Sequence, residues 1–198
     1  MRDYSKLLKL AKENNGIIQT KLVVENNISK HYLRFAVQDK ILEKVKNGIY
    51  ITPDTIEDEL YFIQLKSKNL IYSYETSAYY NELTTRTPLI LSITTLKGNN
   101  TSSLKSKYEL DFHFVSKDVF NLGLTSTKTM LGNVILLYDK ERTICDLCSK
   151  NNSRDRFVVN ESLKTYLKMP DKDISKLLKY AKILGVENKL RDKLEILL

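Results

Sequence analysis

The sequence predicts an α+β protein with two domains, because the apolar residues change period along the chain and the charge changes sign. Apolar residues recur at helical spacing near both ends, whereas residues 108–114 alternate apolar and polar in the manner of a strand. Residues 1–52 hold ten basic and five acidic side chains, net +5, and residues 53–95 hold three and six, net −3. We therefore expect a basic domain over residues 1–53 and a larger domain over residues 54–198.

The N-terminal domain should begin with an amphipathic helix. Its apolar face is Tyr4, Leu7, Leu8 and Ala11. Residues 14–16, Asn-Asn-Gly, end this helix, because such residues favour the backbone conformations found at helix C-termini. Ile17 and Ile18 then form a short strand that can pair with a later hairpin.

Two short helices joined by a tight turn come next. Thr20 can cap the first helix, and Asn26-Asn27 forms the turn, because Asn tolerates the left-handed conformation. Ser29 caps the second helix, which begins at Lys30. The buried stripe of this second helix is Leu33, Ala36 and Val37.

A basic hairpin completes the N-terminal domain. Residues 42–46 and 49–51 are joined by Asn47-Gly48, a strong signal for a type I′ turn, which needs positive φ at both positions. Lys44 and Lys46 lie on the first strand. Helix, turn, helix and hairpin together predict a winged helix-turn-helix, a fold that reads duplex DNA.

The residues expected to contact DNA lie on the two short helices and the hairpin. Lys30, His31 and Arg34 project from the N-terminal half of the second helix, the part that reaches base edges or phosphates. Such units also serve as protein-interaction modules, but the net charge of +5 favours DNA. The full set is Thr20, Lys21, Ser29, Lys30, His31, Tyr32, Arg34, Lys44, Lys46 and Asn47.

Residues 54–198 predict a mixed α/β domain with a helical C-terminal tail. Asp54 or Thr55 should cap a helix that buries Ile56, and Asp139 should cap a later one. Three more helices follow that one, with Gly185 between the last two. The expected strands cover residues 70–72, 89–94, 108–114 and 134–138.

The tail holds a possible second basic surface. Lys176, Lys179 and Lys182 recur every three residues, and Leu177 and Leu178 occupy the other side of the same helix. A solvated face is the simplest interpretation, because Lys is the usual residue there. The alternative is a stripe that contacts the DNA backbone or a protein partner.

The cysteines do not predict a metal site or a redox centre. Cys145 and Cys148 are spaced C-x-x-C, but a structural zinc site needs four ligands, and His31 and His113 are the only other soft candidates. The intervening residues are helical in pattern, unlike most redox pairs. We expect both thiols to be semi-buried on a helix, with no metal and no cofactor.

An enzyme is also not favoured. Glu75, Glu109 and Asp111 could be metal ligands of a nuclease, but Glu109, Asp111 and His113 share one strand face, which is most simply solvated. The chain has no Gly-rich phosphate loop and no nucleophile elbow. Arg142 and Asp146, one helical turn apart, should form an intrahelical salt bridge rather than a catalytic pair.

Composition limits the location and the partners. The chain of 198 residues is 42% apolar, which suffices for a core, and no apolar run approaches the length of a membrane span. We expect a cytoplasmic protein without a membrane partner. The formal net charge of +8 favours polyanionic partners.

The arrangement resembles the AbiEi antitoxin family of bacterial abortive-infection (phage-defence) systems. In that family the winged helix ends in a Leu-Glu-x-Val-x-x-Gly-x-Tyr phrase, here residues 42–50. A Glu-Leu helix, a Ser-Ala helix and an Arg-Thr-x-x-Asp-Leu phrase follow, here at residues 59–60, 77–78 and 142–147. One departure is Lys40, where relatives often carry Gly before the wing.

The resemblance covers essentially the whole chain and implies two roles. The first is repression of the protein's own operon through the winged helix. The second is neutralisation of a nucleotidyltransferase-like toxin by the C-terminal domain, without a stable complex. A ligand-sensing winged-helix regulator and a nuclease with a DNA-binding domain remain alternatives.

Overall fold

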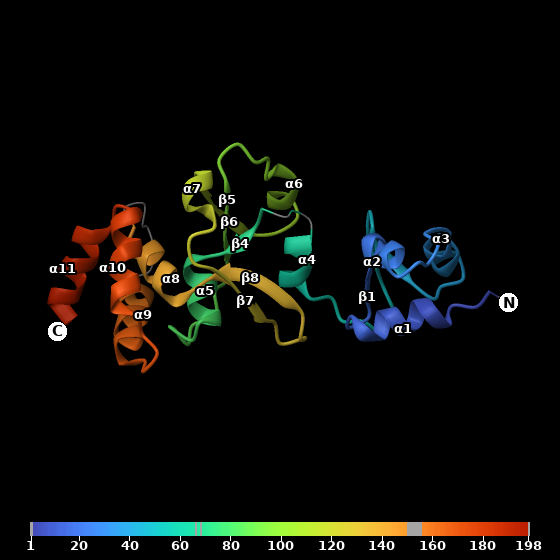
Figure 1. Cartoon of the computed structure of the whole chain (residues 1–198), viewed down its shortest axis with the longest axis horizontal. Helices are drawn as coiled ribbons and strands as arrows, with labels where there is room; N and C mark the ends of the chain where they lie inside the picture. The colour runs from blue at the N-terminus through green and yellow to red at the C-terminus, as the bar shows by residue number, and fades with distance from the viewer. Residues whose placement is uncertain (1, 66, 68, 150–155, 198) are drawn as a thin grey trace. The chain divides into compact units, whose positions relative to one another are not determined.

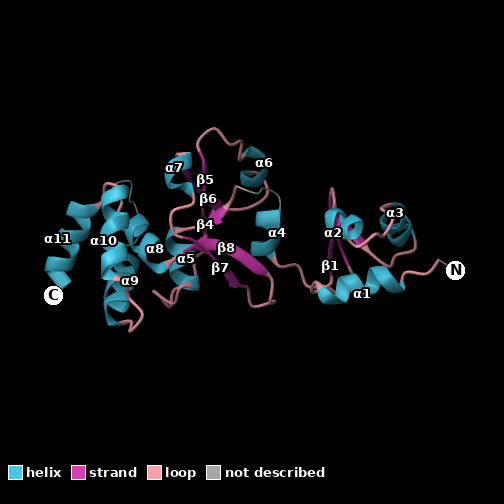
Figure 2. Cartoon of the chain, in the orientation of Figure 1, coloured by secondary structure: helices cyan, strands magenta, loops and turns pink. Residues whose placement is uncertain are grey.

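The computed structural model describes residues 2–65, 67, 69–149 and 156–197. Within these residues the chain is a mixed α+β fold with two sheets, which confirms the predicted class (Figures 1 and 2). It divides into two compact units: Met1–Glu59 with Thr129–Asn133, and Leu60–Lys128 with Val134–Leu198. Residues 54–59, which we assigned to the second domain, thus group with the first unit.

The first unit contains a small antiparallel sheet surrounded by helices. Strand β3 is central in the order β1-β3-β2, and Ile51 lies opposite Ile17 on one side and Glu43 on the other. This sheet confirms that residues 17–18 pair with the hairpin. The elements are α1 (Ser5–Glu13), β1 (Ile17–Gln19), α2 (Thr20–Glu25), α3 (His31–Gln38), β2 (Glu43–Lys46) and β3 (Ile49–Ile51).

The apolar core of this unit joins all three helices. Its buried members are Tyr4, Leu7, Leu10, Ala11, Ile18, Val23, Leu33, Ala36 and Leu42. The expected face of α1 is wrong at Leu8, which is 42% exposed, because the helix buries the row of Leu7, Leu10 and Ala11 instead. The predicted stripe of α3 is confirmed at Leu33 and Ala36, with Val37 partly buried.

Left-handed residues terminate the helices of this unit. Asn15 and Gly16 (φ 52° and 78°) follow α1, and Asn27 (φ 55°) follows α2, as the sequence indicates. Lys40 takes φ 58° after α3, at the position where the resembling family often has Gly. The Ile41 N–H donates to Ala36 O at 2.8 Å and the Lys40 N–H to Val37 O at 3.2 Å, the bond pattern of a Schellman C-cap. The turn therefore forms with a lysine.

The second unit is built on a five-stranded mixed sheet in the order β6-β5-β4-β8-β7. β4 pairs antiparallel with β5 and parallel with β8, β5 runs parallel to β6, and β7 is antiparallel to β8. The strands are β4 (Ile71–Tyr72), β5 (Leu91–Leu96), β6 (Leu110–Val115), β7 (Leu124–Lys128) and β8 (Val134–Tyr138).

Helices cover both faces of this sheet. Ile63 of α4 and Leu104 of α6 pack with Ile93 and Leu137 on one face, and Phe120 of α7 packs against the other face. Helices α8 to α11 form the predicted helical tail. The helices are α4 (Glu59–Leu65), α5 (Tyr74–Tyr80), α6 (Ser102–Lys105), α7 (Lys117–Phe120), α8 (Lys140–Leu147), α9 (Arg156–Lys168), α10 (Ile174–Ile183) and α11 (Glu187–Leu197).

Some boundaries in this unit differ from expectation. Helix α4 begins at Glu59 rather than after Asp54, and Ile56 is 72% exposed instead of buried. Strand β5 begins at Leu91, which leaves Leu89 97% exposed. β7 was not predicted, because its Leu-Thr-Ser-Thr-Lys sequence is mostly polar, as suits a strand at the edge of a sheet.

Helix α8 is the buried centre of the second unit. All residues from Glu141 to Leu147 are buried, and the Asp139 side chain caps the helix by accepting the Arg142 N–H at 2.8 Å. Arg142 is 1% exposed; its Nε donates to Asp146 at 2.8 Å and its Nη1 to Val119 O at 2.7 Å. The expected intrahelical pair is present, but in the core rather than on the surface.

No helix within the described residues is long and apolar enough to span a membrane.

The left-handed Lys40 leads to a stability prediction. A residue with a Cβ is strained at positive φ by about 1–2 kcal/mol, and a glycine in its place relieves this strain. Part of the resulting stabilisation is lost, because glycine makes the unfolded chain more flexible. Lys40→Gly should therefore stabilise the first unit by ~0.5–1 kcal/mol in denaturant unfolding. Lys40→Ala, the matched control, removes the same charge without relieving the strain. Equal unfolding midpoints for the two variants would contradict this account of the turn.

Candidate functional site

The candidate site is the surface formed by α2, α3 and the β2–β3 hairpin of the first unit. Asn27 turns the chain between the helices, and the Ile28 N–H donates to Val23 O at 3.0 Å. α3 begins at His31, one residue later than expected, and Ser29 Oγ accepts the His31 N–H at 3.4 Å. The Ser29 hydroxyl is therefore hydrogen-bonded to the first residue of the helix.

The outer face of α3 carries a polar stripe. His31, Arg34 and Gln38 follow each other at i, i+3 and i+7, and all three are exposed, opposite the buried Leu33 and Ala36. Gln38 was not among the expected site residues, although its spacing from Arg34 marks the same face. Its amide can both donate and accept hydrogen bonds, which suits a base edge.

Exposed lysines also lie next to α3 in sequence and on other elements of the first unit. Lys30 precedes α3 and Lys44 lies on β2; both are exposed. Lys21, on α2, is exposed but lies 3.5 Å from Glu25, so its charge is partly balanced. Within the described part of the chain, Lys30, Arg34 and Lys44 take part in no ion pair, so these three charges are available to an anion.

The start of α2 is joined to the hairpin turn. Thr20 is the first residue of α2 rather than its cap, because the N-cap position is held by Gln19. Its N–H donates instead to Gly48 O at 2.9 Å. This bond places Thr20 beside the turn and holds α2 and the hairpin in one frame.

The hairpin turn is present, but it is not type I′. Gly48 has φ 80°, whereas Asn47 is not among the positive-φ residues. The register between β2 and β3 shifts between Lys44 and Lys46, which indicates a bulge and permits a different turn. Asn47 is exposed, and Lys46 is half-buried, so Lys46 presents less of its side chain than Lys44.

Tyr32 lies at the edge of the surface. Its ring meets that of Tyr4 edge-on, with 6.2 Å between centroids, and it remains 38% exposed. One side of the Tyr32 ring thus packs against the segment before α1. His31 and Arg34, the other expected residues on α3, make no ring contact with another residue that the structure describes.

The three spaced lysines in the tail do not form one free basic surface. Lys176 lies 3.0 Å from Asp139 and 2.9 Å from Glu141, so its charge is used inside the second unit. Although burial opposes it, hydrogen bonds to Glu141 and Asp139 raise the pKa of Lys176 above its usual value. Lys179 and Lys182 are exposed. The expected second basic surface is therefore reduced to these two residues.

Neighbouring positions on α10 also differ from expectation. Leu177 is buried, but Leu178 is 46% exposed rather than on the inner side. Ile183 is 49% exposed on the same helix. Lys179 and Lys182 therefore stand among apolar side chains, unlike a purely basic stripe.

The residues considered for a nuclease do not form a metal site. Asp111 Oδ2 lies 3.1 Å from His113 Nε2, and the His113 ring packs on Tyr74 at 3.9 Å, so this strand face is not simply solvated. Glu75 accepts a hydrogen bond from Ser92 Oγ at 3.2 Å. No group of three metal-binding side chains occurs among the described residues.

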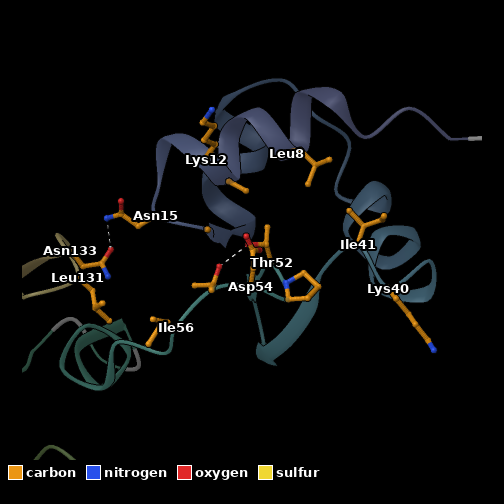
Figure 3. A pocket seen from close by; sticks show the side chains of 14 residues that line it. Leu8, Lys12, Asn15, Lys40, Ile41, Thr52, Asp54, Ile56, Leu131 and Asn133 are labelled. Carbon is orange, nitrogen blue, oxygen red and sulfur yellow. Dashed lines mark hydrogen bonds between the residues drawn. The ribbon is translucent and has the colours of Figure 1, made fainter.

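A shallow groove of about 780 Å³ opens on the first unit. Its floor is largely apolar, and Thr52 and Thr55 hydrogen-bond at 2.7 Å beside it. Figure 3 shows the ammonium ends of Lys12 and Lys40 pointing away from the hollow. The lining residues are Leu8, Ala11, Lys12, Asn15, Gly16, Lys40, Ile41, Thr52–Ile56, Leu131 and Asn133. Asp54 is the acidic side chain in this lining.

Comparison with known proteins supports the fold. No protein family and no curated protein matches the chain. A solved structure, the RV2827C protein from Mycobacterium tuberculosis, is similar over 97% of this chain and 80% of that one, with a TM-score of 0.51 and 11% sequence identity. At this identity the likeness shows a shared fold alone.

The two cysteines yield a prediction about reactivity. Cys145 and Cys148 are both buried, rather than semi-buried, and Cys145 Sγ lies 3.7 Å from Leu177 O. Burial raises the pKa of the Cys148 thiol to about 11 and raises that of Cys145 as well. Since the thiolate is the reactive form, neither cysteine should react with Ellman's reagent in the folded protein at mildly alkaline pH. Both should react in denaturant; rapid labelling of the native protein would contradict a structural role.

Proposed function

We propose that residues 1–53 form a winged helix-turn-helix that binds duplex DNA, with α3 as the recognition helix and the β2–β3 hairpin as the wing. The order α1-β1-α2-α3-β2-β3 and the antiparallel three-stranded sheet suit this assignment. The observation that carries it is the exposed stripe of His31, Arg34 and Gln38 on α3, in the same unit as the exposed Lys44 of the hairpin. Such a helix can enter a major groove while the wing meets phosphates.

Charge supports the same partner. Residues 1–52 have a net charge of +5, although Arg2 and Lys21 are paired with acidic side chains. Lys30, Arg34 and Lys44, which take part in no ion pair among the described residues, lie within this region, so counterion release from DNA would favour binding. A winged helix that served only as a protein module would not require this distribution of charge.

Substitutions should separate base contacts from phosphate contacts. Arg34→Ala should weaken binding to the operator by ~1–3 kcal/mol and relax specificity at one position. Lys44→Ala/Lys46→Ala should weaken binding to all duplexes and flatten the salt dependence by about one unit for each lysine. Fluorescence anisotropy with the upstream promoter and a scrambled duplex measures both effects.

The matched control for these variants is Lys6→Ala/Lys12→Ala, which removes the same charge from α1. These lysines are exposed and lie outside the candidate surface. If the α1 variant loses as much affinity as the hairpin variant, DNA does not bind specifically through α3 and the wing.

We further propose that the protein is an antitoxin that represses its own operon and neutralises a nucleotidyltransferase-like toxin without forming a stable complex. This second role rests on the resemblance to the AbiEi family. The resembling phrase at residues 142–147 is buried in α8, so in this chain it supports the fold of the second unit rather than a surface contact. Neutralisation would then use other parts of that unit.

The two roles should separate in the full-length chain. Arg34→Ala/Lys44→Ala/Lys46→Ala should lose operator binding and still protect cells that express the toxin, because its changes are confined to the first unit. Growth after toxin induction and a promoter reporter measure the two roles in one strain. A folded triple variant that gives no protection would contradict the separation, and wild-type protein that gives none would remove the antitoxin role.

A further inference from the structure

The C-terminal end of α3 holds an acidic side chain where a DNA-binding helix gains nothing from one. Asp39 is the C-cap residue of α3. A carboxylate at this end opposes the helix dipole, and it would also repel phosphates near the helix. Its presence on a surface with several cations therefore needs a physical reason.

Two residues before α1 enclose this carboxylate. The Tyr4 hydroxyl donates to Asp39 Oδ2 at 2.6 Å, and Arg2 Nη1 lies 3.2 Å from the same oxygen. The Arg2 guanidinium also stacks on the ring of Phe35, 4.0 Å from its centroid. These bonds lower the pKa of Asp39, first through the hydrogen bond from Tyr4 and then through Arg2, so the carboxylate is ionised and balanced at neutral pH.

The enclosed residues form one row along α3. Tyr32, Phe35 and Asp39 are spaced i, i+3 and i+7, and each contacts Tyr4 or Arg2. The exposed stripe of His31, Arg34 and Gln38 is offset from this row by one residue. Tyr4 is itself buried at 9% exposure, so its contacts connect Tyr32 and Asp39 to the core. The first residues of the chain thus hold the flank of the helix that presents the stripe.

We propose that Arg2 is a positioning and charge-neutralising residue for α3: it cancels the Asp39 charge and, with Tyr4, fixes the orientation of the helix toward DNA. This inference rests on the proposed function of the first unit. It gives Arg2 an indirect role, distinct from a phosphate contact. Arg2 and Asp39 remain 48% and 41% exposed, so solvent screens their attraction and the effect on affinity is modest.

A double-mutant cycle tests the proposal. Arg2→Ala should weaken DNA binding about twofold to fivefold, because it leaves an unbalanced carboxylate beside the duplex. Asp39→Asn should bind at least as well as the wild type, since its amide can still accept from Tyr4. Arg2→Ala/Asp39→Asn should regain the wild-type salt dependence and the part of the affinity that the unbalanced charge removes, measured by anisotropy with the upstream promoter.

A measurement without DNA tests the positioning role separately. Amide hydrogen exchange of the free protein should quicken in the C-terminal half of α3 in Arg2→Ala and in Tyr4→Phe, while β5 is unchanged. Both variants keep their apolar contacts in the core, so a thermal scan should show the fold intact. Unchanged exchange in α3 for both variants overturns positioning.

The remaining outcomes are distinguishable. If Arg2→Ala flattens the salt dependence by about one unit and Asp39→Asn does not rescue it, Arg2 contacts phosphate directly and the proposal is wrong. If Arg2→Ala binds normally while Arg34→Ala does not, the proposal fails and the DNA-binding function stands. If Arg34→Ala and Lys44→Ala/Lys46→Ala also bind normally, the function itself fails.

Discussion

The pairing of β3 with strands on both sides is the constraint on which the candidate surface depends. Ile51 lies opposite Ile17 of β1 and Glu43 of β2, so one short strand joins the segment before α2 to the hairpin. The bond from the Thr20 N–H to Gly48 O adds a direct link between α2 and the hairpin turn. α3 packs on the same core through Leu33 and Ala36. The exposed stripe of α3 and the hairpin are therefore held in one frame, as the proposed DNA-binding role requires.

Pairing, rather than the number of basic residues, decides which charges can meet a partner. Lys176 is paired with Asp139 and Glu141, and Arg142 binds Asp146 and backbone carbonyls within the core. Both residues contribute to the formal charge of +8, but acidic side chains of the second unit already balance them. In the first unit, Lys30, Arg34 and Lys44 keep their charge at the surface. Exposed cations without an ion pair among the described residues therefore include those of α3 and the hairpin.

Turns and helix caps could be predicted where the type of a single residue determines the local backbone conformation. Asn27 and Gly48 adopt the left-handed conformations that their residue types favour, and Asp139 caps α8 as its position suggests. Lys40 shows the opposite case, because the Schellman cap imposes a conformation that lysine disfavours. Here the requirement of the turn outweighs residue preference.

Burial set by distant partners could not be predicted in the same way. Leu89 and Ile56 are apolar but exposed, because the strand and helix that would bury them begin later in the chain. His113 was placed on a solvated face, but Tyr74 covers it from α5. Of the candidate site, Arg34 and Lys44 follow from periodicity and the hairpin pattern. The half-burial of Lys46 and the internal pairs of Lys176 depend on contacts that no short window of sequence contains.

The central claim, that the first unit binds duplex DNA through α3 and the hairpin, can be tested on the unmodified chain. Amide hydrogen exchange should be measured by mass spectrometry with and without a duplex from the upstream promoter, at low salt where electrostatic binding is strongest. The account predicts slower exchange in peptides that cover residues 29–38 and 43–48, with little change in the five-stranded sheet. Binding that instead protects the second unit, or that leaves residues 29–38 unchanged, would contradict it.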